Sequence, residues 1–398
     1  MSQFVAYAGL LGTASACVYI GSYCALHTPI KTRELRKAAG KDVNEDEEEG
    51  QSQSLSSGNA YIFPVIGSAV LFSLYLAFKY FDKAMINTML SAYFAFAGAL
   101  AIPVAAEHLI KMANGGKVGG YEALLLRVRI PNPFAKKALE VKKSDKPAPP
   151  ITDANVPGTA PPVSSNAITI DLLGLVLMGI YLYSRHWMLT NIVAVCFAIQ
   201  GIMLITLDSF STGYILLAGL FFYDIFWVFG SAKLVRSGPS VMVSVATNFD
   251  GPIKILCPKN LLEVASAYLG GRTVPSLAFA LLGLGDIVIP GVFVALALRF
   301  DQKHASESQP SLGFTRFYYR FAKPYFTTCL AAYVGGLVFT MAVMHVFGAA
   351  QPALLYLSPA CSLSVVFLAI ARKELKEQWN WVDKTTEPTP PEKEKKAN

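Results

Sequence analysis

Residues Leu277–Leu298 read LAFALLGLGDIVIPGVFVALAL and hold one charged residue, Asp286. The stretch is long enough to cross the hydrocarbon core of a bilayer, which takes about 20 apolar residues. An ionised side chain at the centre of such a helix costs about 2.5–3.5 kcal/mol. The stretch therefore predicts a membrane protein in which Asp286 has a function.

A second apolar stretch, Ile215–Gly230 (ILLAGLFFYDIFWVFG), also holds a single acid, Asp224. If the two helices are neighbours that run in opposite directions, both aspartates fall about half-way along their spans and face each other. Two carboxyl groups at close range in low dielectric cannot both ionise, so they share one proton. This is the arrangement of an aspartic protease, in which one carboxylate activates water and the protonated partner hydrogen-bonds the peptide carbonyl.

The two aspartates are compatible with two different classes of protein. Intramembrane acids also line cation or proton pathways, or bond across helices. A transporter or channel would lose flux on either Asp→Asn change, with no effect on peptide cleavage. The pair alone therefore leaves a protease and a polytopic transporter or channel both open.

The composition excludes an ordinary soluble domain. Of 398 residues, 53% are hydrophobic and 15% are charged, whereas charged residues make up about 25% of a typical soluble chain. The six cysteines show no metal-ligand spacing, and no nucleotide-binding loop, zinc motif or Ser/His nucleophile signature is present. We expect no cofactor, no metal and no nucleic-acid partner.

The apolar runs predict an all-α membrane protein with a bundle of about nine transmembrane helices. The candidate spans are 4–26, 60–81, 85–110, 167–184, 188–207, 211–231, 275–299, 327–348 and 352–371. The second and third, joined by a few residues, are expected to form an antiparallel pair. The fourth and fifth are short and divide at Arg185-His186, and Asn191 and Gln200 of the fifth are expected to hydrogen-bond between helices.

We divide the chain into three regions. They are an N-terminal membrane region (1–166, three spans with acidic and basic cytosolic connectors), a catalytic core of six spans (167–371) and a cytosolic tail (372–398).

The distribution of charge predicts the orientation. Met1–Gly9 carries no basic residue, whereas basic residues follow the first span, which favours a retained helix with a lumenal N-terminus. Alternation then puts the long connectors 27–59, 111–166 and 301–326 and the C-terminus in the cytosol, where lysine and arginine are enriched. The connector Ala232–Val274 is a misfit, because it places several basic residues in the lumen. The acidic run Asp42–Gly50 and the proline-rich Lys146–Pro162 predict solvated tethers.

A third motif, Pro352-Ala353-Leu354, opens the last apolar segment. Together with Tyr223-Asp224 and Gly283-Leu284-Gly285-Asp286, in this order in consecutive late segments, it resembles the signal peptide peptidase family of intramembrane aspartyl proteases, relatives of the presenilins. The resemblance runs from about Ile168 to Ala371. Prepilin-type peptidases share a Gly-x-Gly-Asp signature, but the Pro-Ala-Leu segment and the nine-span layout argue against them.

The resemblance implies a function for each of these motifs. Asp224 and Asp286 would be the catalytic pair, and Pro352, Ala353 and Leu354 would shape the site and help seat substrate. Family members cleave type II-oriented transmembrane segments, chiefly remnant signal peptides, in the endoplasmic reticulum membrane. The resemblance thus implies partners of that kind within the bilayer, and a homo-oligomer remains open.

Two further features bear on the expected activity. The glycines before Asp286 and Pro290-Gly291 after it weaken a helix and free backbone groups that can pair with an extended peptide. In the tail, Lys395 and Lys396 lie three and two residues before the C-terminal Asn398. A di-lysine at this place resembles an endoplasmic reticulum retrieval signal read by coat proteins.

Overall fold

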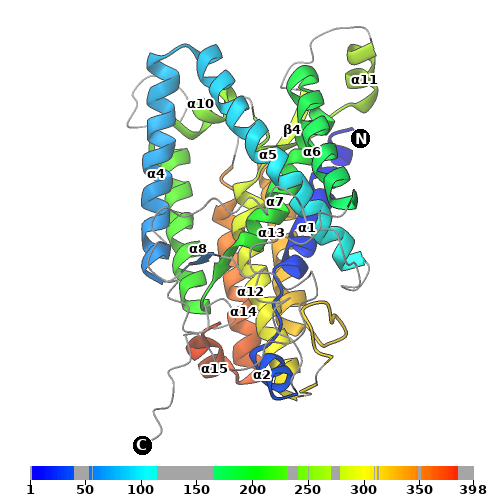
Figure 1. Cartoon of the computed structure of the whole chain (residues 1–398). Coiled ribbons are helices and arrows are strands. Elements are labelled where there is room, and N and C mark those ends of the chain that lie inside the picture. The colour runs from blue at the N-terminus through cyan, green and yellow to red at the C-terminus, as the bar shows by residue number, and fades with distance from the viewer. Residues whose placement is uncertain are drawn as a thin grey trace, which may run out of the picture.

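The computed structural model describes residues 2–39, 53–55, 57–113, 165–231, 241–249, 251–269, 278–308, 310–311, 313–347 and 351–383. It is a predominantly helical bundle (Figure 1). The long helices are α1 (Ser2–Cys24), α4 (Ser57–Tyr80), α5 (Lys83–Ala113), α6 (Ser165–Ser184), α7 (Trp187–Leu204), α8 (Phe210–Ile225), α12 (Gly285–Ser308), α13 (Pro324–Phe347) and α14 (Leu354–Arg372). The shorter helices are α2 (Ile30–Ala38), the π-helix η3 (Phe226–Gly230), α10 (Val241–Asn248), α11 (Leu261–Leu269) and α15 (Leu375–Asn380).

This architecture confirms the predicted all-α membrane fold. By length and composition, seven of the described helices could cross a membrane, including α8 continued through η3. The apolar part of α6 is shorter, and α12 becomes charged from Arg299 onward. The predicted division between the fourth and fifth spans is confirmed, because α6 ends at Ser184 and α7 begins at Trp187. Between them Arg185 has a positive φ of 46°, and His186 caps α7 by accepting from Met188 N–H.

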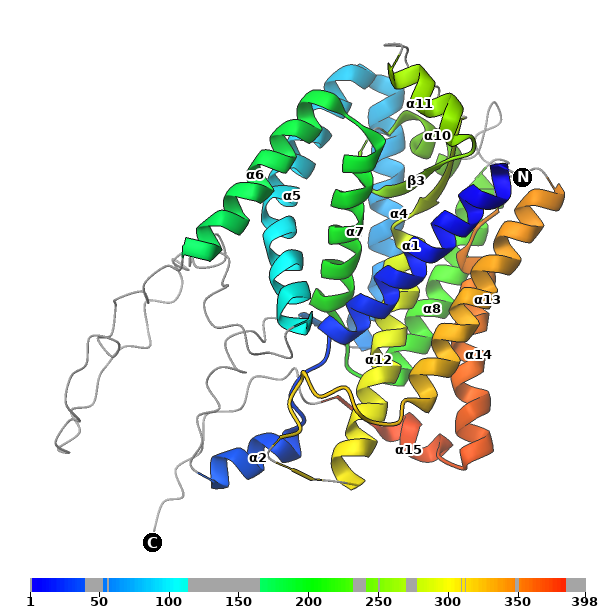
Figure 2. The same cartoon turned by 90° about the vertical axis from the view of Figure 1, so that its right-hand side faces the viewer.

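The two ends of the bundle differ in the elements they hold. We call the end with the N-terminus, α10 and α11 the N-side, and the end with α2 and α15 the C-side (Figure 2). α8 runs from the C-side toward the N-side, and α12 runs back in the opposite direction. This meets the sequence-based expectation that the two aspartate-bearing segments are antiparallel.

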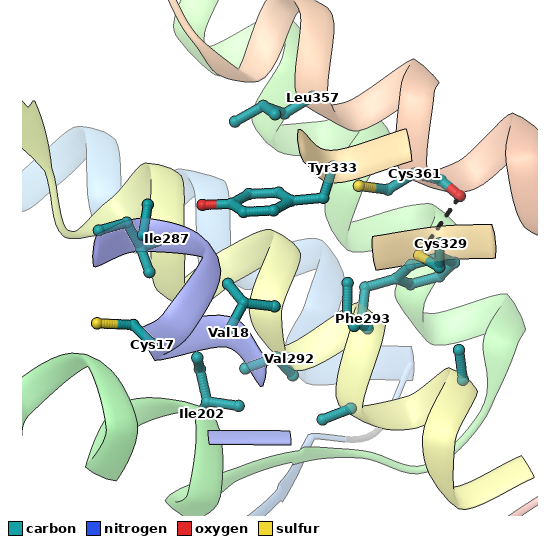
Figure 3. Packing of buried hydrophobic residues seen from close by; sticks show 14 of the residues in the cluster. Cys17, Val18, Ile202, Ile287, Val292, Phe293, Cys329, Tyr333, Leu357 and Cys361 are labelled. Carbon is teal, nitrogen blue, oxygen red and sulfur yellow. Dashed lines mark hydrogen bonds between the residues drawn. The ribbon is translucent and has the colours of Figure 1, made fainter. Parts of the chain in front are cut away.

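The helix α12 lies at the centre of the core. Its residues Val292–Leu298 are at most 2% exposed, as expected for a helix that is apolar all round. Neighbouring helices approach closely through glycines. A Cβ at Gly213 of α8 would lie 2.7 Å from the ring of Phe293 on α12, and one at Gly291 of α12 would lie 2.6 Å from Ile202 on α7. Figure 3 shows this packed core, with Ile202, Val292 and Phe293 labelled.

The predicted seventh span, 275–299, is wrong as one continuous helix. Its first part is a strand, β4 (Phe279–Gly283), and α12 begins only at Gly285. β4 pairs antiparallel with β3 (Lys254–Pro258), while β1 (Gln53–Leu55) pairs parallel with β2 (Ile205–Leu207). Glycine is unfavourable within a helix, so Gly283-Leu284-Gly285 is where the chain changes from strand to helix. Asp286 consequently lies in the first turn of α12 and not half-way along a helix.

The predicted α4–α5 pair also needs correction. Both helices form, joined by Phe81 and Asp82, but beyond this turn α5 leans away from α4 (Figure 1). α4 packs mainly on α8, and α5 packs mainly on α6 and α7. The predicted tethers Asp42–Gly50 and Lys146–Pro162 lie outside the described residues.

Candidate active site

Asp224 lies in the last turn of α8, at the point where the helix changes its hydrogen bonding. α8 begins at an N-cap, Ser209, whose hydroxyl accepts from Thr212 N–H. It then continues without a break into the π-helix η3. π-helical turns are rare and are frequent at functional sites. Asp224 is only 2% exposed, so its carboxyl group is held inside the protein.

The Pro-Ala-Leu motif contacts Asp224 directly. The backbone N–H of Leu354 donates to Oδ2 of Asp224 at 3.2 Å. Leu354 is the first residue of α14, where helix N–H groups have no partner within the helix and the helix dipole is positive. Pro352 and Ala353 precede it, and both are buried. The motif therefore places a helix N-terminus against the carboxyl group of Asp224.

Asp286 is held from the opposite side. Its backbone carbonyl lies 3.4 Å from the hydroxyl of Tyr333 on α13, which donates to it. Tyr333 is fully buried, and Figure 3 shows its ring pointing toward the part of the core where Ile287 lies. This contact fixes the backbone at the start of α12, while the carboxyl group of Asp286 remains half-buried.

Asp224 and Asp286 lie on helices that contact each other. The helices that carry them, α8 and α12, both pack against α14. The pairing of Asp224 with Asp286 as catalytic residues stays a prediction, and the packing of their helices is compatible with it. Two acids in such surroundings can hold one proton between them and act together as acid and base.

The two glycines before Asp286 have few close neighbours. A Cβ at Gly283 would lie 3.5 Å from Oδ2 of Asp286, and one at Gly285 would meet no atom within 4 Å among the described residues. No steric clash therefore requires glycine at either position. A side chain at 285 would instead project into open space.

β4 leads directly into the site and has a free edge. Leu284 N–H bonds to Ile253 O at 2.9 Å, and Lys259 N–H bonds to Ala278 O at 2.8 Å. Since hydrogen-bonded pairs alternate along an antiparallel ladder, the peptide groups of residues 279, 281 and 283 point away from β3. These groups have no hydrogen-bond partner in the described parts of the chain. Leu281 is also 51% exposed.

The opposite edge of the hairpin is closed by a side chain. Asn191 of α7 accepts from Leu256 N–H at 2.8 Å and donates to Leu256 O at 2.6 Å. It thereby satisfies both outward peptide groups of Leu256 in β3. The expectation that Asn191 hydrogen-bonds between helices is wrong, because its partner is a strand. No comparable side-chain bond closes the β4 edge within the described residues.

α4 forms a wall beside Asp224. Trp227 Nε1–H donates to Ser68 Oγ at 3.0 Å. A Cβ at Gly67 would lie 3.7 Å from the ring of Tyr223, so the phenol that precedes Asp224 faces α4. The carboxyl group of Asp224 and the ring of Tyr223 thus face different neighbours.

Several features of the site could not be identified from the sequence motifs. Tyr333, Ser68 and the strand β3 carry no local pattern that marks them, and only the polarity of Asn191 in an apolar run was a signal. Lys395 and Lys396 lie outside the described residues. Within the described ranges, no group of three or more His, Cys, Asp or Glu residues is placed to hold a metal ion.

Comparisons with known proteins identify the family of the chain. A family model described as signal peptide peptidase matches residues 47–385. The chain is 34% identical over 381 residues to signal peptide peptidase of Homo sapiens, covering 95% of this chain and 83% of the relative. The same figures hold for the Mus musculus protein. A probable intramembrane protease of Schizosaccharomyces pombe is 32% identical over 349 residues, covering 87% of this chain and 90% of that protein.

Proposed function

This chain belongs to the signal peptide peptidase family, and on that premise we propose that Asp224 and Asp286 are the catalytic pair with which it hydrolyses membrane-spanning peptides. The family membership decides between the two classes left open by the sequence, so the chain is an intramembrane protease and not a transporter. We propose type II transmembrane segments, chiefly remnant signal peptides, as its substrates.

The observation that carries the assignment is the hydrogen bond from Leu354 N–H to Asp224 Oδ2. It joins the third motif to the first, and Asp286 of the second motif lies at the start of α12, which packs against both α8 and α14. In the reaction, the ionised carboxylate takes a proton from water as the water attacks the peptide carbonyl. The protonated partner hydrogen-bonds the carbonyl oxygen and later helps protonate the leaving nitrogen. The helix N-terminus at Leu354 stabilises the ionised form of Asp224.

A substrate helix must be unwound locally, because its amides are otherwise hydrogen-bonded within the helix. We propose that the substrate pairs as an added strand with the free edge of β4. The outward peptide groups of Leu281 and Gly283 support this, since they precede Asp286 by only a few residues. A strand bound there would carry an extended peptide past the open space beside Gly285 and over the two carboxyl groups.

The test uses the purified full-length protein with a labelled type II signal peptide. We expect Asp224→Asn and Asp286→Asn each to lower the cleavage rate by about 100-fold or more, since positioned acid–base groups contribute 10²–10⁴-fold. Asp171→Asn is a matched control. Asp171 is a buried aspartate of α6, a helix that packs mainly on α5. Cleavage that persists in both active-site variants, or is lost equally in the control, would overturn the assignment.

We further propose that the protein resides in the endoplasmic reticulum membrane, with its N-terminus lumenal and its C-terminus cytosolic. The excess of lysine and arginine in the connectors on the C-side supports this orientation. Lys395 and Lys396 would then be available to coat proteins. Changing both lysines to alanine should move a fluorescently tagged protein to later compartments, and an unchanged distribution would argue against retrieval.

A further inference from the structure

The end of α4, the start of α5 and α10 lie together at the N-side of the bundle (Figure 1). Residues of these three elements line a cavity. Its volume is about 180 Å³, and it is lined by Tyr75, Phe78, Lys79, Lys83, Ser244, Val245 and Asn248. None of these residues belongs to the active site described above. The cavity is large enough for a small polar group with part of a side chain.

The floor of the cavity is well packed. Phe78 of α4, Ile86 of α5, and Val245 and Phe249 of α10 form a buried apolar cluster. Asn87 Nδ2 on α5 also donates to Asn248 O on α10 at 3.0 Å. These contacts fix the three elements relative to one another, while the side chains of Lys79 and Lys83 are exposed and accessible to a ligand.

The lining carries two cations. Lys79 Nζ lies 6.0 Å from the ring centre of Tyr75 and 5.7 Å from that of Tyr80. Neither Lys79 nor Lys83 forms an ion pair with any described residue. The nearby carboxyl group of Asp82 accepts from Ala84 N–H at 3.3 Å. Within the described part of the chain these two ammonium groups have no carboxylate partner, and beside the amide of Asn248 they suit an anion with two oxygens.

The position of the cavity relative to the active site limits what that anion can be. On α4, Gly67 and Ser68 lie beside Tyr223 and Trp227, and Lys79 follows Ser68 by eleven residues. Eleven helical residues span about 16 Å. An extended peptide covers the same length with about five residues. A peptide held at Asp224 could therefore reach this cavity with its end.

We propose that this cavity binds the terminal α-carboxylate of the substrate peptide. The inference rests on the proposed function: a remnant signal peptide of type II orientation has been cut free at its C-terminal end, which then lies on the N-side. That cut creates a carboxylate that an intact membrane protein does not have there. Lys79 and Lys83 bind the carboxylate, and the apolar wall formed by Tyr75 and Val245 contacts the last side chain. The site would therefore select peptides already released by a preceding endopeptidase.

The experiment compares two synthetic type II signal peptides that differ only at the C-terminus, one with a free carboxylate and one with an amide. The full-length protein is reconstituted in phosphatidylcholine nanodiscs. We expect kcat/KM to be about three- to tenfold higher for the carboxylate peptide, because partly exposed ion pairs are worth up to about 1 kcal/mol each. Lys79→Gln/Lys83→Gln should abolish this preference while cleavage of the amidated peptide continues. Lys79→Arg/Lys83→Arg should keep it, and Lys31→Gln on the C-side is the control.

Three results would overturn the proposal. Equal cleavage of the two peptides by the unaltered protein would show that the terminal charge is not recognised. Equal loss for both peptides in the double glutamine variant would assign the lysines to folding. A lysine effect that appears only when anionic lipid is added, and is the same for both peptides, would assign the cavity to a lipid headgroup. If the amidated peptide is still cut in an Asp224-dependent manner, the proposed function survives any of these results.

Discussion

Asp224 depends on contacts that other segments of the chain supply. Its carboxyl group is buried and accepts from the first N–H of α14, while the backbone of Asp286 is held by Tyr333. Each acid is thus oriented by an element distant in sequence. The glycine before Asp286 has no steric requirement of its own, and we propose that it leaves space for substrate.

Gly285→Ala tests that role. Outside its chain neighbours and the backbone of its own helix, the added methyl group meets no described atom within 4 Å. Alanine is also favoured over glycine in a helix by up to about 1 kcal/mol. We expect unfolding to be unchanged or slightly harder, while kcat/KM falls about tenfold or more because the methyl group occupies the space beside Asp286. Gly179→Ala on α6, which also meets open space, is the control. Full activity of the Gly285 variant would show that substrate does not lie there.

At the scale of elements, the strand-to-helix change before Asp286 is the main difference from the sequence-based expectation. The catalytic candidates and the Pro-Ala-Leu motif could be predicted, because charge in an apolar run and short ordered motifs are local signals. The β3–β4 hairpin could not. Phe279–Gly283 is as apolar as a spanning helix, and a short apolar run does not by itself distinguish strand from helix. Its partner Lys254–Pro258 lies in a connector and is too short to be recognised.

Leu281→Pro tests the free edge of β4. The N–H of Leu281 points away from β3, so proline removes a group that only an added strand would use. We expect at least about a tenfold loss of kcat/KM with little loss of stability, since the side chain is 51% exposed. Leu281→Ala keeps the N–H and should retain most of the activity. If the proline and alanine variants cleave equally well, substrate does not pair with this edge.

On the scale of the whole molecule, the segment after α14 connects the C-side ends of both aspartate-bearing helices. Asp383 pairs with Arg299 of α12 at 3.3 Å, with both side chains almost fully buried. Gln378 Nε2 of α15 donates to the hydroxyl of Tyr214 on α8 at 3.1 Å. Trp381 packs against Phe300 of α12. This segment therefore holds α8 and α12 together at the end opposite to the cavity.

Asp383→Ala should destabilise the protein by about 3–5 kcal/mol, because it leaves the buried guanidinium of Arg299 without its carboxylate. The double variant Arg299→Met/Asp383→Leu removes both charges and should recover most of that loss. Glu377→Ala, which breaks an exposed pair with Lys303, should cost at most about 1 kcal/mol. Thermal unfolding of the purified variants measures all three. A single variant as stable as the double one would refute a structural role for the pair.

His27, in the connector after α1, gives this end of the molecule a dependence on pH. Burial, with the nearby charge of Arg299, lowers the pKa of His27 to about 4. An unfolded histidine titrates near pH 6.5, so the unfolded state binds more protons between pH 6.5 and 4. Folding stability contributed by His27 is therefore complete above pH 6.5 and is lost as the pH falls through that window, by up to about 3 kcal/mol. Unfolding of His27→Gln should depend less on pH in this range, and an identical dependence would contradict the account.

The central claim, that Asp224 and Asp286 act as one pair on a peptide bond, is tested most directly by binding a signal peptide whose scissile carbonyl is replaced by a secondary alcohol. Such a group resembles the tetrahedral transition state, which the site should bind more tightly than the substrate. The account predicts that its hydroxyl contacts both carboxyl groups, so that Asp224→Asn and Asp286→Asn each weaken binding about tenfold or more. Binding that is unchanged in either variant would contradict it.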